Sequence, residues 1–271
     1  MMREFEEFDP LTLAKTAESD VDKVIVRGIL DSYHGNYDLF AEILQNAVDA
    51  IEHEYRNRVE KYGKPDENYI PTIWITLDLA DNSVQVCDNG TGMSEKTFKG
   101  AISPGFTMKT LLSATSKTKI PSAMRFRGHK GVGLTYLAYG FNYLKISTKT
   151  TGEEIHGEIR DGRRWVNDDR SQGEVGALPR PKVTPSKETS PEFKEIPSGT
   201  CVTVRCDNDT TPRKLNRITS EFNEWALILR TETALGLVDL SSNEEWAKRT
   251  KVYLKVDTTG RKEAFKPIEF S

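Results

Sequence analysis

Four short stretches of the sequence carry side chains and glycines that suit the binding of a charged ligand. The first lies in a helical pattern over residues 37–60, where Glu42, Asn46 and Asp49 follow at four- and three-residue spacing and share one face. Short polar groups in line on a half-buried helix need partners, and a metal, a water or a ligand would serve. An ordinary solvated stripe is the alternative, because helix surfaces are normally polar.

The second stretch, residues 88–92, reads Asp-Asn-Gly-Thr-Gly and follows a strand pattern. A carboxylate at the end of a strand can accept a hydrogen bond from a flat ligand, and Gly90 and Gly92 let that ligand approach the backbone. Asp88 is therefore a candidate binding residue. A plain β-turn would explain the same residues, since Asp, Asn and Gly are common in turns.

The third stretch, residues 128–133, reads Gly-His-Lys-Gly-Val-Gly and opens a helix. Exposed backbone N–H groups at a helix start favour anions such as phosphate. The stretch is not a P-loop, because Gly-Lys-Ser/Thr is missing, and no strand directly precedes it as in a Rossmann fingerprint. The fourth stretch, Ser198-Gly199-Thr200, leads into a strand and by itself predicts only a turn.

These stretches are positioned by a mixture of helices and strands. The helix at 37–60 has an apolar stripe at three- and four-residue spacing. Strands are predicted at 75–79, 83–88, 143–148, 154–160 and 200–206, further helices at 131–140 and 215–231, short helical segments at 9–33, and short strand-like runs at 236–271. Hairpins without strict βαβ alternation predict an α+β fold with an antiparallel or mixed sheet.

The composition excludes several classes of protein. The 271 residues carry a net charge of −3, which argues against a wholly basic nucleic-acid binder, although residues 56–64 and 180–187 are locally basic. No apolar run approaches the roughly 18 residues of a membrane span, and the N-terminus lacks the apolar region of a secretory signal. The four histidines share no metal-ligand spacing with the cysteines, so a structural zinc site is not expected.

The three cysteines, Cys87, Cys201 and Cys206, cannot all pair within the chain. Cys201 and Cys206 lie five residues apart in a strand pattern, so their side chains point to opposite faces and a bond between them is implausible. This cysteine usage favours a reducing, cytoplasmic location.

Together and in this order, the stretches resemble the GHKL superfamily of Bergerat-fold ATPases. That superfamily includes gyrase B subunits, large heat-shock chaperones, histidine kinases, MutL-type mismatch-repair proteins and MORC-type proteins. The matching segments are EILQNAVDAI (42–51), VCDNGTGM (86–93), RGHKGVGL (127–134) and SGTCVTV (198–204). The resemblance covers about residues 35–232 and implies an α+β fold, an α/β sandwich with a mixed, mostly antiparallel sheet and helices on one face.

The resemblance implies magnesium-dependent binding and hydrolysis of ATP. It makes Glu42 the general base for the attacking water, Asn46 the side chain that holds Mg²⁺, Asp49 a supporting residue, and Asp88 the acceptor for the adenine amine. It also implies contacts to the nucleotide from residues of the glycine-containing stretches: Gly90, Gly92, Met93, Gly128, His129, Lys130, Gly131, Val132, Gly133 and Thr200.

Domain boundaries follow from the same resemblance. We expect an N-terminal arm at 1–35, an ATP-binding domain at 36–232, and the start of a following domain or a C-terminal extension at 233–271. Within the ATP-binding domain, 94–127 corresponds to an ATP lid, in which Lys109 would contact phosphate, and 161–199 is a loop or insertion. The chain would then be the N-terminal ATPase part of a longer protein whose effector or client is open.

Several functions remain open at this point. A histidine kinase is disfavoured, because only 41 residues precede Glu42 and His34 lies in a turn-like context. Hydrolytic members of the superfamily clamp two subunits together, and the segment 1–35 would be the arm of such an ATP-dependent homodimer. A non-hydrolysing ATP sensor that controls an effector and a DNA-associated ATPase are the alternatives.

Overall fold

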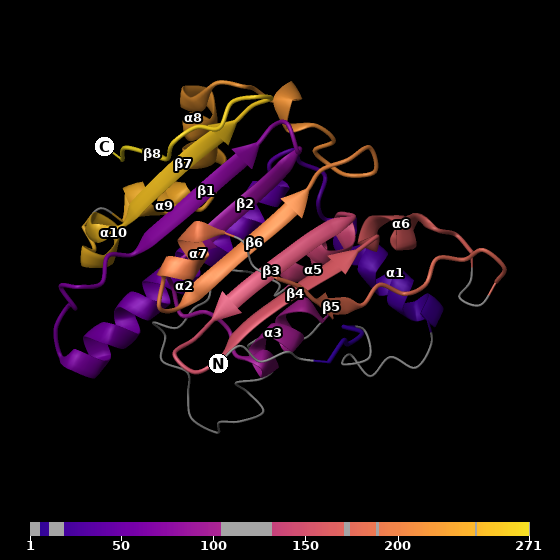
Figure 1. Cartoon of the computed structure of the whole chain (residues 1–271), viewed down its shortest axis with the longest axis horizontal. Coiled ribbons are helices and arrows are strands. Elements are labelled where there is room, and N and C mark those ends of the chain that lie inside the picture. The colour runs from indigo at the N-terminus through magenta and orange to yellow at the C-terminus, as the bar shows by residue number, and fades with distance from the viewer. Residues whose placement is uncertain are drawn as a thin grey trace.

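Eight strands form one mixed sheet, and most of the helices pack on one side of it (Figure 1). The computed structural model describes residues 6–10, 19–103, 132–170, 174–187, 190–241 and 243–270. The strands are β1 (Thr72–Asp78), β2 (Ser83–Asp88), β3 (Tyr143–Lys149), β4 (Glu154–Arg160), β5 (Val183–Pro185), β6 (Gly199–Arg205), β7 (Lys251–Asp257) and β8 (Lys266–Pro267). The helices are α1 (Ser19–Leu30), α2 (Asp38–Tyr62), α3 (Glu95–Ile102), α5 (Gly133–Gly140), α6 (Gly162–Asn167), α7 (Pro191–Glu195), η2 (Leu215–Arg217), α8 (Phe222–Glu232), α9 (Leu235–Leu240) and α10 (Glu245–Arg249).

The strand order is β5-β4-β3-β6-β2-β1-β7-β8. All neighbouring strands are antiparallel except β1 and β7, which run parallel. This arrangement confirms the predicted α+β class and the mixed, mostly antiparallel sheet. No helix within the described residues is both long and apolar enough to cross a bilayer.

Helix α2 is the longest helix among the described residues, and its 25 residues pack across β1, β2 and β6. The predicted apolar stripe is the buried face: Leu39, Phe40, Ile43, Leu44, Ala47, Val48, Ile51 and Tyr55 are all buried. The helix ends at Gly63, whose φ of 70° allows its N–H to bond to the carbonyl of Val59. The polar residues on the remaining face of α2 are therefore held in place by the core beneath them.

The two faces of the sheet are covered unequally. Val84 and Val86 of β2 point into the main core beneath the helices, and by strand alternation Asp88 lies on the same side. Cys87 points to the opposite face, where α7 contributes Phe193 to a smaller apolar cluster. Helix α7 is thus an exception to the expectation of helices on one face only.

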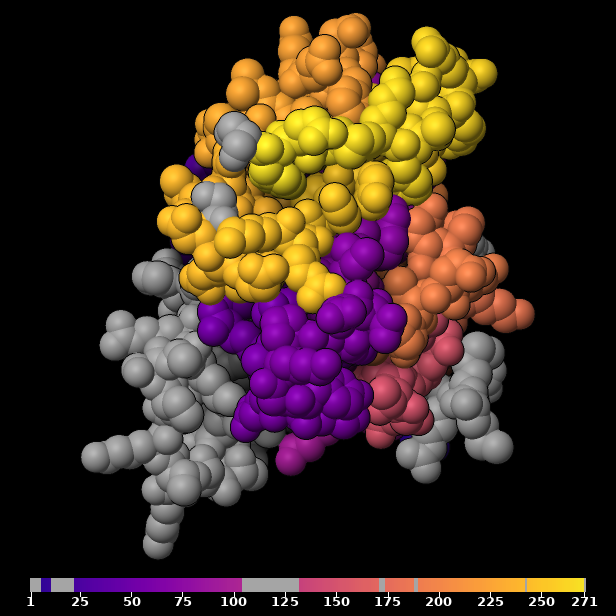
Figure 2. All heavy atoms as spheres, turned by 90° about the vertical axis from the view of Figure 1, so that its left-hand side faces the viewer, coloured from indigo at the N-terminus to yellow at the C-terminus, as the bar shows by residue number. Residues whose placement is uncertain are grey.

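The C-terminal elements join the same sheet. Strand β7 pairs in parallel with β1 over its whole length, and β8 adds an antiparallel edge. Figure 2 shows these elements, in yellow, directly beside the purple part of the chain that contains α2. Arg56 of α2 also bonds to Glu244, at the start of α10.

The described part of the N-terminal segment lies along the other edge of the sheet. Phe8 forms an antiparallel bridge with Val183 of β5, with hydrogen bonds of 3.2 and 2.9 Å between their main chains. Close by, Arg180 forms ion pairs with Asp9 and with the buried Asp22. Residues 6–10 therefore pack against their own chain in this structure.

Some element predictions were wrong. The helix predicted over 215–231 is a 3-10 turn followed by α8, which begins only at Phe222. The break occurs because the Thr219 hydroxyl accepts the N–H of Glu221 and the Thr219 carbonyl accepts the indole N–H of Trp225, so local bonds compete with the helix. The range 236–249, predicted to be strand-like, is mostly helical, since α9 and α10 lie there.

Two segments predicted to be irregular contain regular elements. Residues 161–199 include α6, the edge strand β5 and α7. Within the predicted lid, residues 95–102 form α3, which begins at the N-cap Ser94, whose hydroxyl accepts the N–H of Thr97. These elements are short, and so their periodicity was too weak to be read from the sequence.

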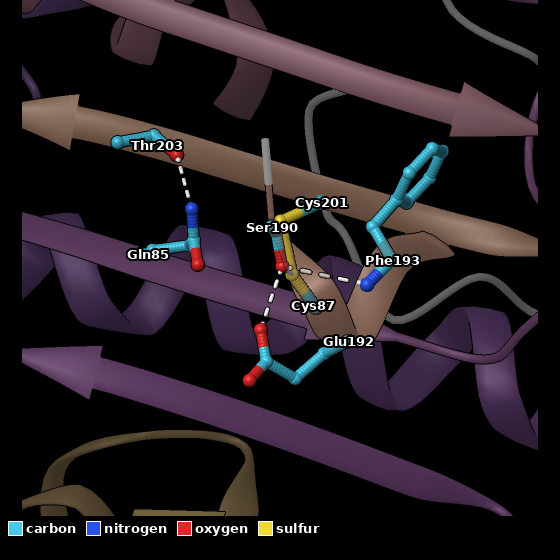
Figure 3. Close-up of a disulfide and its surroundings, with 7 residues drawn as sticks. All are labelled: Gln85, Cys87, Ser190, Glu192, Phe193, Cys201 and Thr203. Atoms are coloured by element: carbon cyan, nitrogen blue, oxygen red, sulfur yellow. Dashed lines mark hydrogen bonds between the residues drawn. A yellow bond between two sulfur atoms is a disulfide. The ribbon is translucent and has the colours of Figure 1, made fainter. Parts of the chain in front are cut away.

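A disulfide joins Cys87 of β2 to Cys201 of β6 (Figure 3). The buried Cys206 is free. The two half-cystines are directly opposite each other in the antiparallel pair, with Cα atoms 4.0 Å apart. The prediction that Cys201 and Cys206 do not bond is confirmed, but the bond between Cys87 and Cys201 was not predicted. The cysteine content therefore no longer supports a reducing compartment.

The cystine predicts a defined thiol count and a loss of stability on reduction. Chain purified without reductant, denatured and alkylated should gain one alkyl group, at Cys206, and three after reduction with a dithiol. Because the bond closes a loop with a sequence separation of 114, its reduction should lower the free energy of unfolding by about 2–4 kcal/mol. Mass spectrometry and urea titration are the measurements, and three alkyl groups without reduction would refute the bond.

Candidate functional site

The structure places the first motif on the solvent-facing side of α2. Glu42 and Asp49 are half-buried, and Asn46 between them is exposed. The amide of Gln45 donates to Oδ1 of Asp49 at 2.8 Å, which ties that carboxylate to its own helix. The face therefore presents oxygen atoms, the donor type that Mg²⁺ prefers, from residues whose backbone is rigidly packed.

The Glu42 carboxylate is held from two sides. The hydroxyl of Tyr33 donates to Oε1 at 2.9 Å. The other oxygen lies against the main chain of Gly133, where an added Cβ would meet Oε2 at 2.1 Å. Burial raises the pKa of Glu42, the Tyr33 hydrogen bond opposes that rise, and the charge of Asp38 adds to it. The first motif and the end of the third motif thus meet at this carboxylate.

Asp88 is a buried carboxyl group at the end of β2. Its side chain accepts the N–H of Gly90 at 2.8 Å, and the N–H of Thr200, its partner residue in β6, also bonds to it. Burial nevertheless raises the pKa of Asp88 to about 7, because desolvation penalises the charged form more than these bonds favour it. A shifted carboxyl group of this kind is typical of functional sites.

The loop after Asp88 touches α2 and β3 through its glycines. An added Cβ on Gly90 would lie 2.5 Å from the carbonyl carbon of Ala50 in α2. Gly92 has a φ of +65°, and an added Cβ there would meet the carbonyl oxygen of Lys149 at 1.9 Å. Both positions therefore need glycine for packing reasons, whether or not a ligand is bound.

Thr148 of β3 is a site residue that sequence reasoning missed. Its fully buried hydroxyl accepts the N–H of Met93 at 2.8 Å and lies 3.1 Å from the hydroxyl of Thr200. It therefore connects the end of the second motif to the fourth. A buried threonine in a predicted strand was the available indication, but its partner is set by strand register, which the sequence does not reveal. Tyr33, outside all four motifs, was missed as well.

The described motif residues form one continuous region. Asp88 pairs with Thr200, the loop at Gly90 touches α2, and Gly133 reaches Glu42 on that helix. Val132 directly precedes α5, and its carbonyl accepts the N–H of Tyr136. Five predicted site residues lie outside the described residues: Lys109, Gly128, His129, Lys130 and Gly131.

Within the described residues there is no cluster of three or more His, Cys, Asp or Glu that would hold a metal by itself. Mg²⁺ is commonly bound through one or two protein oxygens, with water and substrate phosphates completing the shell. The exposed amide of Asn46, one helical turn from Glu42, is compatible with that kind of site.

Comparison with known proteins supports the superfamily resemblance without selecting a member. No family model matches the chain. A chaperone protein HtpG from Alcanivorax borkumensis is 26% identical over 159 residues, which are 56% of this chain and 24% of the relative. A chaperone protein HtpG from Sulfurovum sp. is 30% identical over 128 residues, 45% of this chain and 20% of the relative. The matched part thus spans about a quarter or less of the length of these curated relatives.

The glycine at position 92 gives a direct test of the site geometry. Replacing Gly92 by Ala should lower the free energy of unfolding by about 2–4 kcal/mol, because the methyl group meets a backbone carbonyl and the positive φ is strained for Ala. Gly152→Ala is the matched control, since an added Cβ there has no neighbour within 4 Å. Urea titration measures both, and equal stability of the two variants would contradict the described packing.

Proposed function

We propose that the chain binds ATP with Mg²⁺ and hydrolyses it to ADP and phosphate. The observation that carries this proposal is that one helix, α2, contacts both the loop after Asp88 and the start of α5. Ala50 and Glu42, the two contact points, are eight residues apart, or about 12 Å along the helix axis. That span is comparable with the separation of the purine and the terminal phosphate in ATP.

At the purine end, Asp88 would accept the adenine amine, and Thr200 would support it. Asp88 is buried and one of its oxygens already accepts the N–H of Gly90, so the carboxylate is oriented before a ligand arrives. Met93 is partly buried against the core and would pack near the base. The preference for adenine would follow, because a carboxylate acceptor suits an exocyclic amine.

At the phosphate end, Glu42 would orient the attacking water and take its proton. Asn46 would hold Mg²⁺, with Asp49 in support, and the ion when bound would neutralise charge on the phosphates. Positioning and charge neutralisation are what phosphoryl transfer mainly requires. The glycines from 128 to 133 and the residues between them would lie at the phosphates, with Lys109 approaching from the lid.

The similarity to HtpG chaperones supports the proposal of an ATP-binding domain of chaperone type. An ATP-driven clamp of two copies is the form we favour, and the effector or client is left open. DNA binding gains no support from the basic runs, because their arginines are paired with acidic groups: Arg56 with Glu52 and Glu244, Arg58 with Glu54 and Asp66, and Arg180 with Asp9 and Asp22.

Replacing Glu42 separates catalysis from binding. Glu42→Ala should lower kcat for phosphate release by roughly 10²–10⁴-fold, the usual contribution of one general base, and leave the Kd for ATP largely intact. Glu60→Gln, at an exposed position on the same helix, is the control and should match the unaltered chain. Equal loss of binding and hydrolysis would contradict the role of Glu42. Equal phosphate release by the unaltered chain and Glu42→Ala would instead favour a non-hydrolysing sensor.

Asp88 predicts a pH dependence of nucleotide affinity. The charged form accepts the amine, and the pKa of Asp88 in the free protein is about 7, so ATP affinity should fall up to tenfold per pH unit below pH 7. Asp88→Asn should weaken ATP binding by roughly 10–100-fold at pH 8, the effect of losing a hydrogen bond to a charged group, and flatten this pH dependence. Isothermal titration calorimetry is the measurement.

Asp169→Asn is the control for this series, because Asp169 is almost fully exposed in its ion pair with Arg27. It should bind ATP like the unaltered chain at every pH. Unchanged ATP affinity in Asp88→Asn would exclude Asp88 as the adenine anchor. An absence of binding heat in the unaltered chain with Mg²⁺ would exclude the proposed function altogether.

A further inference from the structure

Tyr33 lies outside the four motifs, and its hydroxyl contacts the expected catalytic carboxylate of Glu42. It lies in the connection between α1 and α2, where its N–H bonds to the carbonyl of Leu30 at 2.9 Å. Its hydroxyl donates to Oε1 of Glu42 at 2.9 Å. The connection before α2 thus reaches back onto the face of the helix that carries the first motif.

The ring of Tyr33 is fixed independently of its hydroxyl. It stacks on the ring of Tyr136 in α5, with ring centroids 3.9 Å apart and planes within 14°. Tyr136 is itself buried and packs edge-on against Phe141. The direction of the Tyr33 hydroxyl is therefore set by ring packing, so that the hydrogen bond to Glu42 costs little further ordering.

The Tyr33 hydroxyl remains a proton donor at all relevant pH values. Burial first, and then the neighbouring charge of Glu42, raise the pKa of Tyr33 well above its ordinary value. A neutral phenol next to a carboxylate donates to it. Oε1 of Glu42 is thus engaged, and Oε2 lies at Gly133, the first residue of α5 and the end of the third motif.

We propose that Tyr33 is a positioning residue for Glu42, holding one carboxylate oxygen so that the other faces the attacking water. The inference rests on the proposed function. The water oxygen bonds to the γ-phosphorus while the bond from phosphorus to the β–γ bridging oxygen breaks, and ADP leaves with that oxygen and its electron pair. One water proton passes to Oε2 of Glu42. Tyr33 keeps its own proton throughout.

Tyr33→Phe removes the hydroxyl and keeps the stacked ring. Under saturating ATP and Mg²⁺, kcat for phosphate release should fall by about 10–100-fold, the effect of losing a hydrogen bond to a charged group. The Kd for ATP should stay within twofold, because Tyr33 acts on the base and not on the nucleotide. Tyr62→Phe is the matched control, since it removes an exposed hydroxyl at the end of α2, the helix that carries Glu42.

A double-mutant cycle shows whether Tyr33 acts through Glu42. In a Glu42→Gln background, which already lacks the base, Tyr33→Phe should cause no further fall in kcat, because the two residues act as one unit. A further fall as large as in the unaltered chain would overturn the proposal, as would equal losses of binding and turnover in Tyr33→Phe alone.

The positioning role of Tyr33 and the proposed ATPase function can be refuted separately. If Glu42→Gln abolishes turnover and Tyr33→Phe has full kcat, only the positioning role is wrong. If Glu42→Gln has full kcat, Glu42 is not the base and both proposals are overturned together. If the Tyr33→Phe variant has a lowered kcat but unfolds at the same denaturant midpoint as the unaltered chain, Tyr33 positions Glu42 and does not merely stabilise the fold.

Discussion

The close approach of the main chain to helix α2 is the constraint on which the rest of the site depends. Neither Gly90 nor Gly133 has room for a Cβ, because Ala50 and the Glu42 carboxylate occupy that space. Both contacts are made to one rigid helix, so the loop after β2 and the start of α5 are placed relative to each other by a single element. The glycines of the second and third motifs thus have a packing role that precedes any contact with a ligand.

The buried carboxyl group of Asp88 also makes the folded state less stable than it would otherwise be. Asp88 is 4% exposed and receives N–H donors from Gly90 and Thr200, yet its pKa is raised to about 7. A carboxyl group that prefers the neutral form in the folded chain makes folding less favourable as the pH rises from its ordinary pKa near 4 towards 7. Groups held in this way are typical of binding and catalytic sites, where function and stability compete.

Features that depend on the residue pattern within a single helix or strand could be predicted from the sequence. The apolar stripe of α2 and the alternation in β1 and β2 predicted elements that the structure contains, and the motif order predicted the α+β class. Contacts set by tertiary register were not predictable. Thr148 meets Thr200 across two strands 52 residues apart, and Tyr33 reaches Glu42 from a turn, at a spacing that neither a helix nor a strand would bring together. Short helices such as α9 were not predicted, because six residues span too few helical turns for an apolar periodicity to be recognised.

Strands β2 and β6 carry different chemistry on their two faces. Asp88 and Thr200 are partners across these strands, and the neighbouring partners Cys87 and Cys201 are covalently bonded on the opposite face under α7. A slip of one residue between the strands would turn Asp88 away from α2, because side chains alternate between faces. A covalent bond one residue away forbids that slip. The cystine therefore fixes the register that brings the carboxyl group of the second motif to the threonine of the fourth, although none of the roles that the resemblance implies belongs to a cysteine.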